Sequence, residues 1–252
     1  SAIVLDVHSG AVLAMANHPT FDPNMFASGI STLNWNKLIQ DVSNPLANKS
    51  IQSTYPPGSV FKIVTTAAAL DLGYVTATEI FDDKGFYLLD GWKFYGWETK
   101  GLGKLTIEGA ICWSSDPVFY ELGRRMGIDN LASYGLTFGL GQRTGIKLGG
   151  EEKGIVPTQN WKETTYAEEW YPGETIIAAI GQGYYLVTPL QQAVLLMAVA
   201  NQGVVYRPML VDKVLLPNGE VFEKYNPEVM RRVYLTDETW KIIKNGLVAV
   251  TN

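Results

Sequence analysis

A serine and a lysine stand three residues apart at the start of an apolar run in the segment Tyr55-Pro56-Pro57-Gly58-Ser59-Val60-Phe61-Lys62-Ile63-Val64-Thr65-Thr66-Ala67-Ala68-Ala69-Leu70. The leading Pro-Pro-Gly opposes helix formation, whereas the alanine-rich run after it favours a helix. We therefore expect a buried helix that begins close to Ser59 and stops at Gly73. Lys62 is the only charged residue between Ser59 and Leu70.

This spacing suits nucleophilic catalysis. Residues three apart share a helix face, so the Ser59 hydroxyl and the Lys62 amine can meet. Burial would disfavour the ammonium form of Lys62, lower its pKa and make it a proton acceptor. Backbone N–H groups at the helix start could stabilise an oxyanion beside Ser59. The alternative is a capping serine followed by a lysine whose amine reaches water, and the segment alone leaves both interpretations open.

A second polar cluster follows a predicted apolar helix at Leu105–Trp113. Class A β-lactamases and penicillin-binding proteins carry three elements in order, S-x-x-K, S-D-N and K-T-G. Ser114-Ser115-Asp116 has the order and place of the second element, with aspartate at its third position. Asp116 followed by Pro117 would also be a good N-cap and first-turn pair for a helix running towards Gly127.

Further segments make the pattern more specific. They are Phe138-Gly139-Leu140-Gly141-Gln142-Arg143-Thr144-Gly145-Ile146, Pro157-Thr158-Gln159-Asn160-Trp161, Gly181-Gln182-Gly183-Tyr184 and Val187-Thr188-Pro189-Leu190-Gln191. In this order and spacing, with the two clusters above, they resemble the transpeptidase domain of a class B penicillin-binding protein, above all its elongation type, penicillin-binding protein 2. The resemblance covers nearly the whole chain.

The resemblance implies an α+β fold, with an antiparallel sheet between helical layers and the serine helix in the middle, as a single domain over residues 1–252. It implies a peptidoglycan D,D-transpeptidase that needs no cofactor. By resemblance, Ser59 would be the nucleophile and Lys62 the base. Ser114 would relay protons, and Asp116 would hold the lysine or the substrate amide.

The same resemblance implies partners and a location. The substrates would be peptidoglycan stem peptides that end in D-Ala-D-Ala, the inhibitors β-lactams, and the partner a membrane glycosyltransferase in an elongation complex. The domain would lie on the extracytoplasmic face of the bacterial inner membrane, with its anchor elsewhere. A D,D-carboxypeptidase, a serine β-lactamase and a non-catalytic β-lactam-binding sensor or scaffold are the alternatives.

The third element departs from the family pattern. No Lys-Thr-Gly or Lys-Ser-Gly occurs, and the only x-Thr-Gly is Arg143-Thr144-Gly145. That triplet lies in a glycine-punctuated segment that the family carries separately from its third motif. We therefore expect the third element to follow the helix that begins near Thr236, beyond Asn252, so that the domain is incomplete at its C-terminus.

Composition excludes several other functions. A net charge of −5 and a pI near 5.1, without a large basic cluster, argue against nucleic-acid binding. The single cysteine, Cys112, excludes an internal disulfide. Asp82, Asp83 and Glu98 lack a nearby histidine, so we expect scattered acids on a surface loop rather than a metal site.

Local patterns predict the remaining elements. Two hairpins are expected, one from Ile3–Val7 and Ala11–Ala16 and one from Val211–Leu216 and Glu220–Lys224 around Asn218-Gly219. The aromatic segment Ile80–Thr99 should form a rim hairpin or lobe. Helices are expected at Thr175–Gln182, at Pro189–Asn201 and from Thr236 onwards.

Overall fold

The computed structural model describes residues 1–251. Its α-helices are α1 (Thr32–Gln40), α2 (Lys49–Gln52), α3 (Lys62–Asp71), α4 (Ile107–Cys112), α5 (Asp116–Met126), α6 (Ile128–Thr137), α7 (Gln159–Tyr166), α8 (Pro172–Ala178), α9 (Pro189–Ala200) and α10 (Asp237–Ala249). Two short 3-10 helices are η1 (Pro23–Phe26) and η2 (Gly58–Phe61). The strands are β1 (Ala2–Leu5), β2 (Val12–Ala16), β3 (Phe81–Asp83), β4 (Phe86–Leu89), β5 (Trp92–Tyr95), β6 (Gly103–Leu105), β7 (Val204–Tyr206), β8 (Lys213–Leu215), β9 (Val221–Lys224) and β10 (Val229–Arg232).

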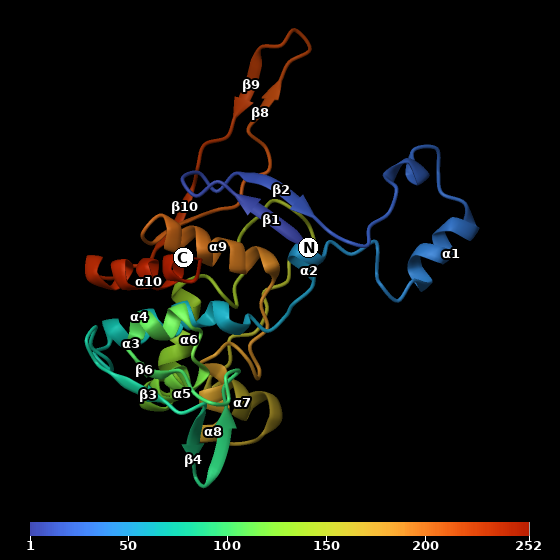
Figure 1. Cartoon of the computed structure of the whole chain (residues 1–252). Coiled ribbons are helices and arrows are strands. Elements are labelled where there is room, and N and C mark those ends of the chain that lie inside the picture. The colour runs from blue at the N-terminus through green and yellow to red at the C-terminus, as the bar shows by residue number, and fades with distance from the viewer. Residues whose placement is uncertain (252) are drawn as a thin grey trace.

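Helix α3 forms the centre of the core, as the sequence predicts. Every residue from Lys62 to Ala69 is buried. Small alanine side chains let neighbouring helices approach closely, and α3 packs against α4, α5, α6 and α10 (Figure 1). Complete burial of Ile63 or Val64 contributes about 1.5–3 kcal/mol each, so this helix is a major source of stability.

The strands form antiparallel pairs between and around the helices. Within residues 1–251 these pairs are β1–β2, β3–β6, β4–β5, β7–β10 and β8–β9, each a two-stranded sheet. The expected combination of helices and antiparallel strands is therefore present, although no larger sheet forms among these residues. Strand β1 and strand β7 both pack on α9, which connects them to the core.

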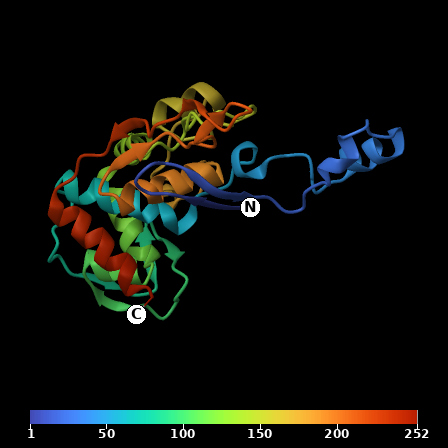
Figure 2. The same ribbon diagram turned by 90° about the horizontal axis from the view of Figure 1, so that it is seen from above.

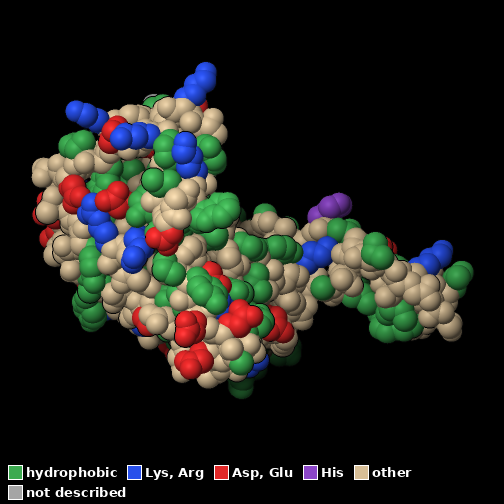
Figure 3. Space-filling model, turned by 90° about the horizontal axis from the view of Figure 1, so that it is seen from below, with side chains coloured by type: hydrophobic (Ala, Val, Ile, Leu, Met, Phe, Trp, Pro, Cys, Tyr) green, Lys and Arg blue, Asp and Glu red, His purple; other side chains and the backbone are tan. Residues whose placement is uncertain are grey.

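Two segments project from the body of the molecule. The β8–β9 hairpin turns at Asn218-Gly219, as predicted, and Gly219 takes the positive φ of 89° that the tight turn requires. The segment that carries η1 and α1 extends on the opposite side from α10 (Figures 1 and 2). Helix α1 buries none of its residues, and Leu33 and Ile39 are among its exposed apolar side chains. Hydrophobic side chains are visible on the surface of the projecting segment in Figure 3.

Other predicted elements are present with shifted ends. The β1–β2 and β4–β5 hairpins, α9, and α10 with Thr236 as its N-cap agree with the sequence. The helix expected at Thr175–Gln182 is instead α8, which starts at Pro172 and ends at Ala178. It starts earlier because the Glu174 carboxylate accepts a hydrogen bond from the Tyr171 N–H, which stabilises the first turn.

Two helix starts also differ in detail. Ser59 lies in η2, and the regular α-helix begins only at Lys62. Ser115, rather than Asp116, is the N-cap of α5, because its hydroxyl accepts from the Val118 N–H. Asp116 is the first residue of that helix, so its carboxylate is not used for capping.

Candidate active site

The start of η2 is held next to the Gly181-Gln182-Gly183 turn. The Gly58 N–H donates to the Gly181 carbonyl at 2.9 Å. Gly181 has a φ of 72°, and a Cβ atom there would lie 2.3 Å from the Gly58 oxygen, so only glycine allows this approach. The Ser59 N–H has no partner among residues 1–251, so it is free to donate to an oxyanion.

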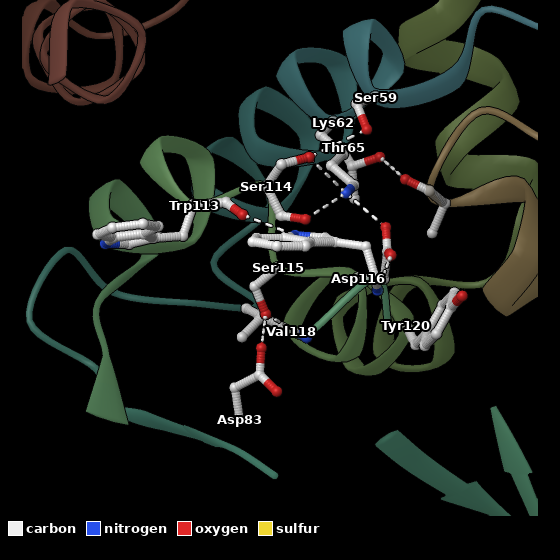
Figure 4. Close-up of polar contacts among 12 residues, drawn as sticks. Ser59, Lys62, Thr65, Asp83, Trp113, Ser114, Ser115, Asp116, Val118 and Tyr120 are labelled. Carbon is white, nitrogen blue, oxygen red and sulfur yellow. Dashed lines mark hydrogen bonds and ion pairs between the residues drawn. The ribbon is translucent and has the colours of Figure 1, made fainter. Parts of the chain in front are cut away.

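Lys62 connects the two predicted clusters. Its Nζ donates to Asp116 Oδ1 at 2.6 Å, to the Ser114 carbonyl at 2.8 Å and to Ser114 Oγ at 2.9 Å (Figure 4). These three contacts use all three donors of an ammonium group. Lys62 is only 3% exposed. The interpretation in which the amine reaches water is therefore wrong.

Ser114 lies between Lys62 and Ser59. Its hydroxyl donates to Ser59 Oγ at 3.0 Å, while it accepts from Lys62. The spacing in the sequence allows the Ser59 hydroxyl to meet the Lys62 amine, but no hydrogen bond joins the two side chains in the described part of the chain. Because Ser59 lies in a 3-10 turn and the Lys62 donors point to Ser114 and Asp116, the two residues are connected through the Ser114 hydroxyl.

The backbone of Ser114 has a left-handed conformation, with φ of 50°. This conformation costs a non-glycine residue roughly 1–3 kcal/mol and must be held by its neighbours. Here the Ser114 N–H donates to the Ile111 carbonyl at the end of α4, and the next residue starts the cap of α5. The result is that both the carbonyl and the hydroxyl of Ser114 face Lys62.

Asp116 is held from its other side by Trp97. Asp116 Oδ1 binds Lys62, whereas Oδ2 accepts from the Trp97 N–H at 3.2 Å. The Trp97 indole N–H in turn donates to the Trp113 carbonyl at 3.0 Å. The sequence predicted only that the aromatic segment Ile80–Thr99, before the second cluster, forms a rim hairpin or lobe. It contained no signal that a backbone N–H in this segment would hold Asp116.

Burial and two carboxylates act in opposite directions on the pKa of Lys62. Burial lowers the pKa of Lys62 below its usual value of 10.5. The hydrogen bond and charge of Asp116, and the charge of Asp83, raise this pKa and oppose that effect. Burial raises the pKa of the neighbouring Tyr120 to about 12, so this phenol stays protonated and is a poor base.

Other candidate groups lie outside this cluster. Thr144 of the Arg143-Thr144-Gly145 segment donates through its N–H and its hydroxyl to Glu151, at 2.7 and 2.6 Å. The segment lies in a loop rather than on a strand.

Within residues 1–251, no group of three or more His, Cys, Asp or Glu side chains is placed to hold a metal ion. None of the helices in this part of the chain is long and apolar enough to cross a membrane.

One acidic residue differs from its prediction. Asp83 was expected on a surface loop, but it lies on β3, is 3% exposed and accepts a hydrogen bond from Ser115 at 2.5 Å (Figure 4). Asp82 next to it is exposed as predicted, but it also lies on β3 rather than on a loop. Strand geometry explains the difference, since successive side chains point to opposite faces.

Comparisons with known proteins place this geometry in context. The profile of the penicillin binding protein transpeptidase domain matches residues 1–252. The peptidoglycan D,D-transpeptidase MrdA of Escherichia coli K12 is 34% identical over 256 residues, which cover 100% of this chain and 40% of the relative. The chain thus spans less than half the length of that relative.

Solved structures are similar as well. A crystal structure of Pseudomonas aeruginosa PBP2 in complex with WCK 5153 aligns with a TM-score of 0.87 at 36% identity, over 97% of this chain and 55% of that chain. A structure of a peptidoglycan synthase complex that coordinates polymerization and crosslinking aligns with a TM-score of 0.86 at 34% identity, over 99% of this chain and 41% of that chain.

Proposed function

Because this chain belongs to the penicillin-binding protein transpeptidase domain family, we propose that it carries the acyl-transfer site of a peptidoglycan D,D-transpeptidase. The observation that carries this proposal is the hydrogen-bonded path from Ser59 through Ser114 to Lys62, which ends at Asp116. Each member has a chemical task in serine acyl transfer. The name of the E. coli relative supports the same reaction.

In the proposed acylation, Ser59 Oγ attacks the carbonyl carbon of the terminal D-Ala-D-Ala amide. Lys62 must first be neutral, and then the Ser114 hydroxyl can turn and donate to the Lys62 nitrogen. The Ser59 proton passes to Ser114 Oγ as the Ser114 proton passes to Lys62. The lysine proton then goes to the departing amine, D-alanine leaves, and an ester to Ser59 remains.

Deacylation completes the cross-link. An amine of a neighbouring stem peptide attacks the ester carbonyl, an amide forms, and Ser59 Oγ regains a proton through the same path. The free Ser59 N–H would stabilise the oxyanion in both steps. Asp116 holds the Lys62 ammonium whenever it is charged, which keeps the nitrogen aligned between steps.

We further propose that the third motif lies on a strand that follows Asn252. In support, the sequence contains no Lys-Thr-Gly or Lys-Ser-Gly, and Arg143-Thr144-Gly145 is bound to Glu151 in a loop. Such a strand would bind the substrate carboxylate and supply a second oxyanion donor. Without such a strand, the 252 residues would be essentially inactive.

The partners and location are part of the same proposal. The similar structure of a peptidoglycan synthase complex supports a membrane glycosyltransferase partner in an elongation complex. The substrates would be stem peptides that end in D-Ala-D-Ala, and β-lactams would acylate Ser59 in their place. The site would then face the periplasm, from a protein anchored in the inner membrane.

The proposal is tested by acylation of the complete domain, extended past Asn252, with a labelled penicillin. Mass spectrometry should locate the adduct on Ser59, and Ser59→Ala should abolish it without loss of the folded state. An adduct on Ser114 or Ser115 instead would contradict the assignment. Release of the acyl group from a D-Ala-D-Ala substrate to an added amine, in preference to water, distinguishes a transpeptidase from a carboxypeptidase or a β-lactamase.

A further inference from the structure

Asp83 is a buried carboxylate outside the four proposed catalytic residues. It ends strand β3, which pairs with β6 in the antiparallel register Asp83↔Gly103. One carboxylate oxygen accepts from the Gly85 N–H at 2.7 Å, and the other accepts from the Ser115 hydroxyl at 2.5 Å. Within residues 1–251 Asp83 takes part in no ion pair. A buried carboxylate without a counter-ion destabilises the folded state, so a neutral side chain at this position would favour stability more than Asp83 does.

Ser115 connects this carboxylate to the site. It is completely buried, its hydroxyl also accepts from the Val118 N–H at 3.4 Å, and its own N–H donates to the Ala110 carbonyl at 3.0 Å. One residue therefore joins β3, the end of α4 and the start of α5. Ser115 follows Ser114 directly, so the bonds that hold Ser115 also restrain the left-handed Ser114 backbone.

We propose that Asp83 is a positioning residue for acyl transfer: its hydrogen bond to Ser115 holds the Ser114 backbone so that the Ser114 hydroxyl stays between Lys62 and Ser59. This inference rests on the proposed function. Asp83 touches neither Ser59 nor Lys62, so it acts through Ser115 and the junction of α4 and α5. The strain in Ser114 makes such support necessary, since a released backbone would relax to negative φ.

The charge of Asp83 has a second effect on the site. Lys62 faces the Asp116 carboxylate and the Phe119 ring of α5, the Ser114 oxygens at the α4–α5 junction, and the more distant Asp83 charge from β3. Asp83 raises the pKa of Lys62, against the larger lowering by burial. Removal of this charge should therefore let Lys62 become neutral at lower pH.

The neighbouring Asp82 provides a matched control. Asp82→Ala and Asp83→Ala each remove one negative charge from β3, but only Asp83 is buried and bonded to Ser115. In the complete domain, Asp83→Ala should slow acylation by labelled penicillin about 10–100-fold, which is the scale of misplacing a catalytic group by about 1 Å. Its pH–rate profile should also move to lower pH, whereas a purely structural loss would lower the rate equally at every pH. Acylation by Asp83→Ala within about threefold of Asp82→Ala at all pH values would overturn the proposal.

A crystal structure separates this inference from the proposed function, because it requires no reaction. In Asp83→Ala, which removes the hydrogen bond to Ser115, and in Ser115→Ala as a second variant if the first does not fold, Ser114 should lose its positive φ and its contact with Lys62. An unchanged Ser114 in either folded variant would refute the positioning role. If the unmodified domain never acylates at Ser59, the proposed function fails, and the position of Ser114 in these variants still decides the present inference.

Discussion

Replacement of Lys62 by arginine tests whether this residue is a base or only a structural cation. The guanidinium stays charged at every pH at which a protein is folded, so Lys62→Arg preserves the charge and removes the proton acceptor. A general base contributes about 10²–10⁴ to a rate, which corresponds to about 2.7–5.4 kcal/mol in the barrier. We expect acylation to fall by this factor.

The structure indicates what else the substitution changes. Lys62 Nζ lies 2.6 Å from Asp116 and 2.8 Å from the Ser114 carbonyl, and an arginine can still bind both acceptors. The larger side chain must fit a buried position, which costs about 1–3 kcal/mol of stability. Thermal unfolding of the variant measures this cost independently of the rate.

The assay is the rate of adduct formation with a fluorescent penicillin in the complete domain, measured from neutral to alkaline pH. Lys62→Met is the companion variant, because it removes both the charge and the base. Both variants should be slow and should lose the rise of rate with pH. Acylation by Lys62→Arg within about tenfold of the unmodified rate, with the same pH profile, would refute the role of Lys62 as the base.

Three further outcomes follow from the site and its surroundings. Because burial lowers the pKa of Lys62, the acylation rate should rise as the pH rises through that lowered pKa. Between the lowered pKa and the unfolded value of 10.5, the free energy of unfolding should increase with pH, because only the unfolded state still binds the lysine proton. A flat pH–rate profile and a pH-independent free energy of unfolding in this range would contradict these two expectations. Gly181→Ala should destabilise the domain by about 1–3 kcal/mol in chemical denaturation, because the new Cβ would lie 2.3 Å from the Gly58 oxygen at a φ of 72°. Gly219→Ala is the control: no atom lies near its Cβ, so this variant measures the effect of positive φ alone. The 252-residue chain should react with penicillin at least about 10²-fold more slowly than the domain extended past Asn252, which is the scale of one lost oxyanion donor. Equal acylation rates would show that the third motif does not lie after Asn252.

Local signals were sufficient for the serine helix and for several other elements. The Pro-Pro-Gly lead and the charge-free alanine run act within a few residues, so the buried helix after Ser59 could be predicted. The same holds for the Asn218-Gly219 hairpin and for the Thr236 cap of α10. The start of α5 was harder, because Ser115 and Asp116 are both good caps and only the packed structure shows that Ser115 is used.

The amino-acid pattern thus identified Ser59, Lys62, Ser114 and Asp116 as candidates, because motif order and spacing are carried by the chain itself. Their connections depend on tertiary packing. Ser114 reaches Lys62 across 52 positions in the sequence, and Asp83 reaches Ser115 across 32. Such contacts arise where α3, α4, α5 and β3 meet, and no local periodicity encodes which buried side chains will face one another there. The family resemblance implied a proton-relay role for Ser114, but the hydrogen bonds that Ser114 makes and the burial of Asp83 became visible only in the folded protein.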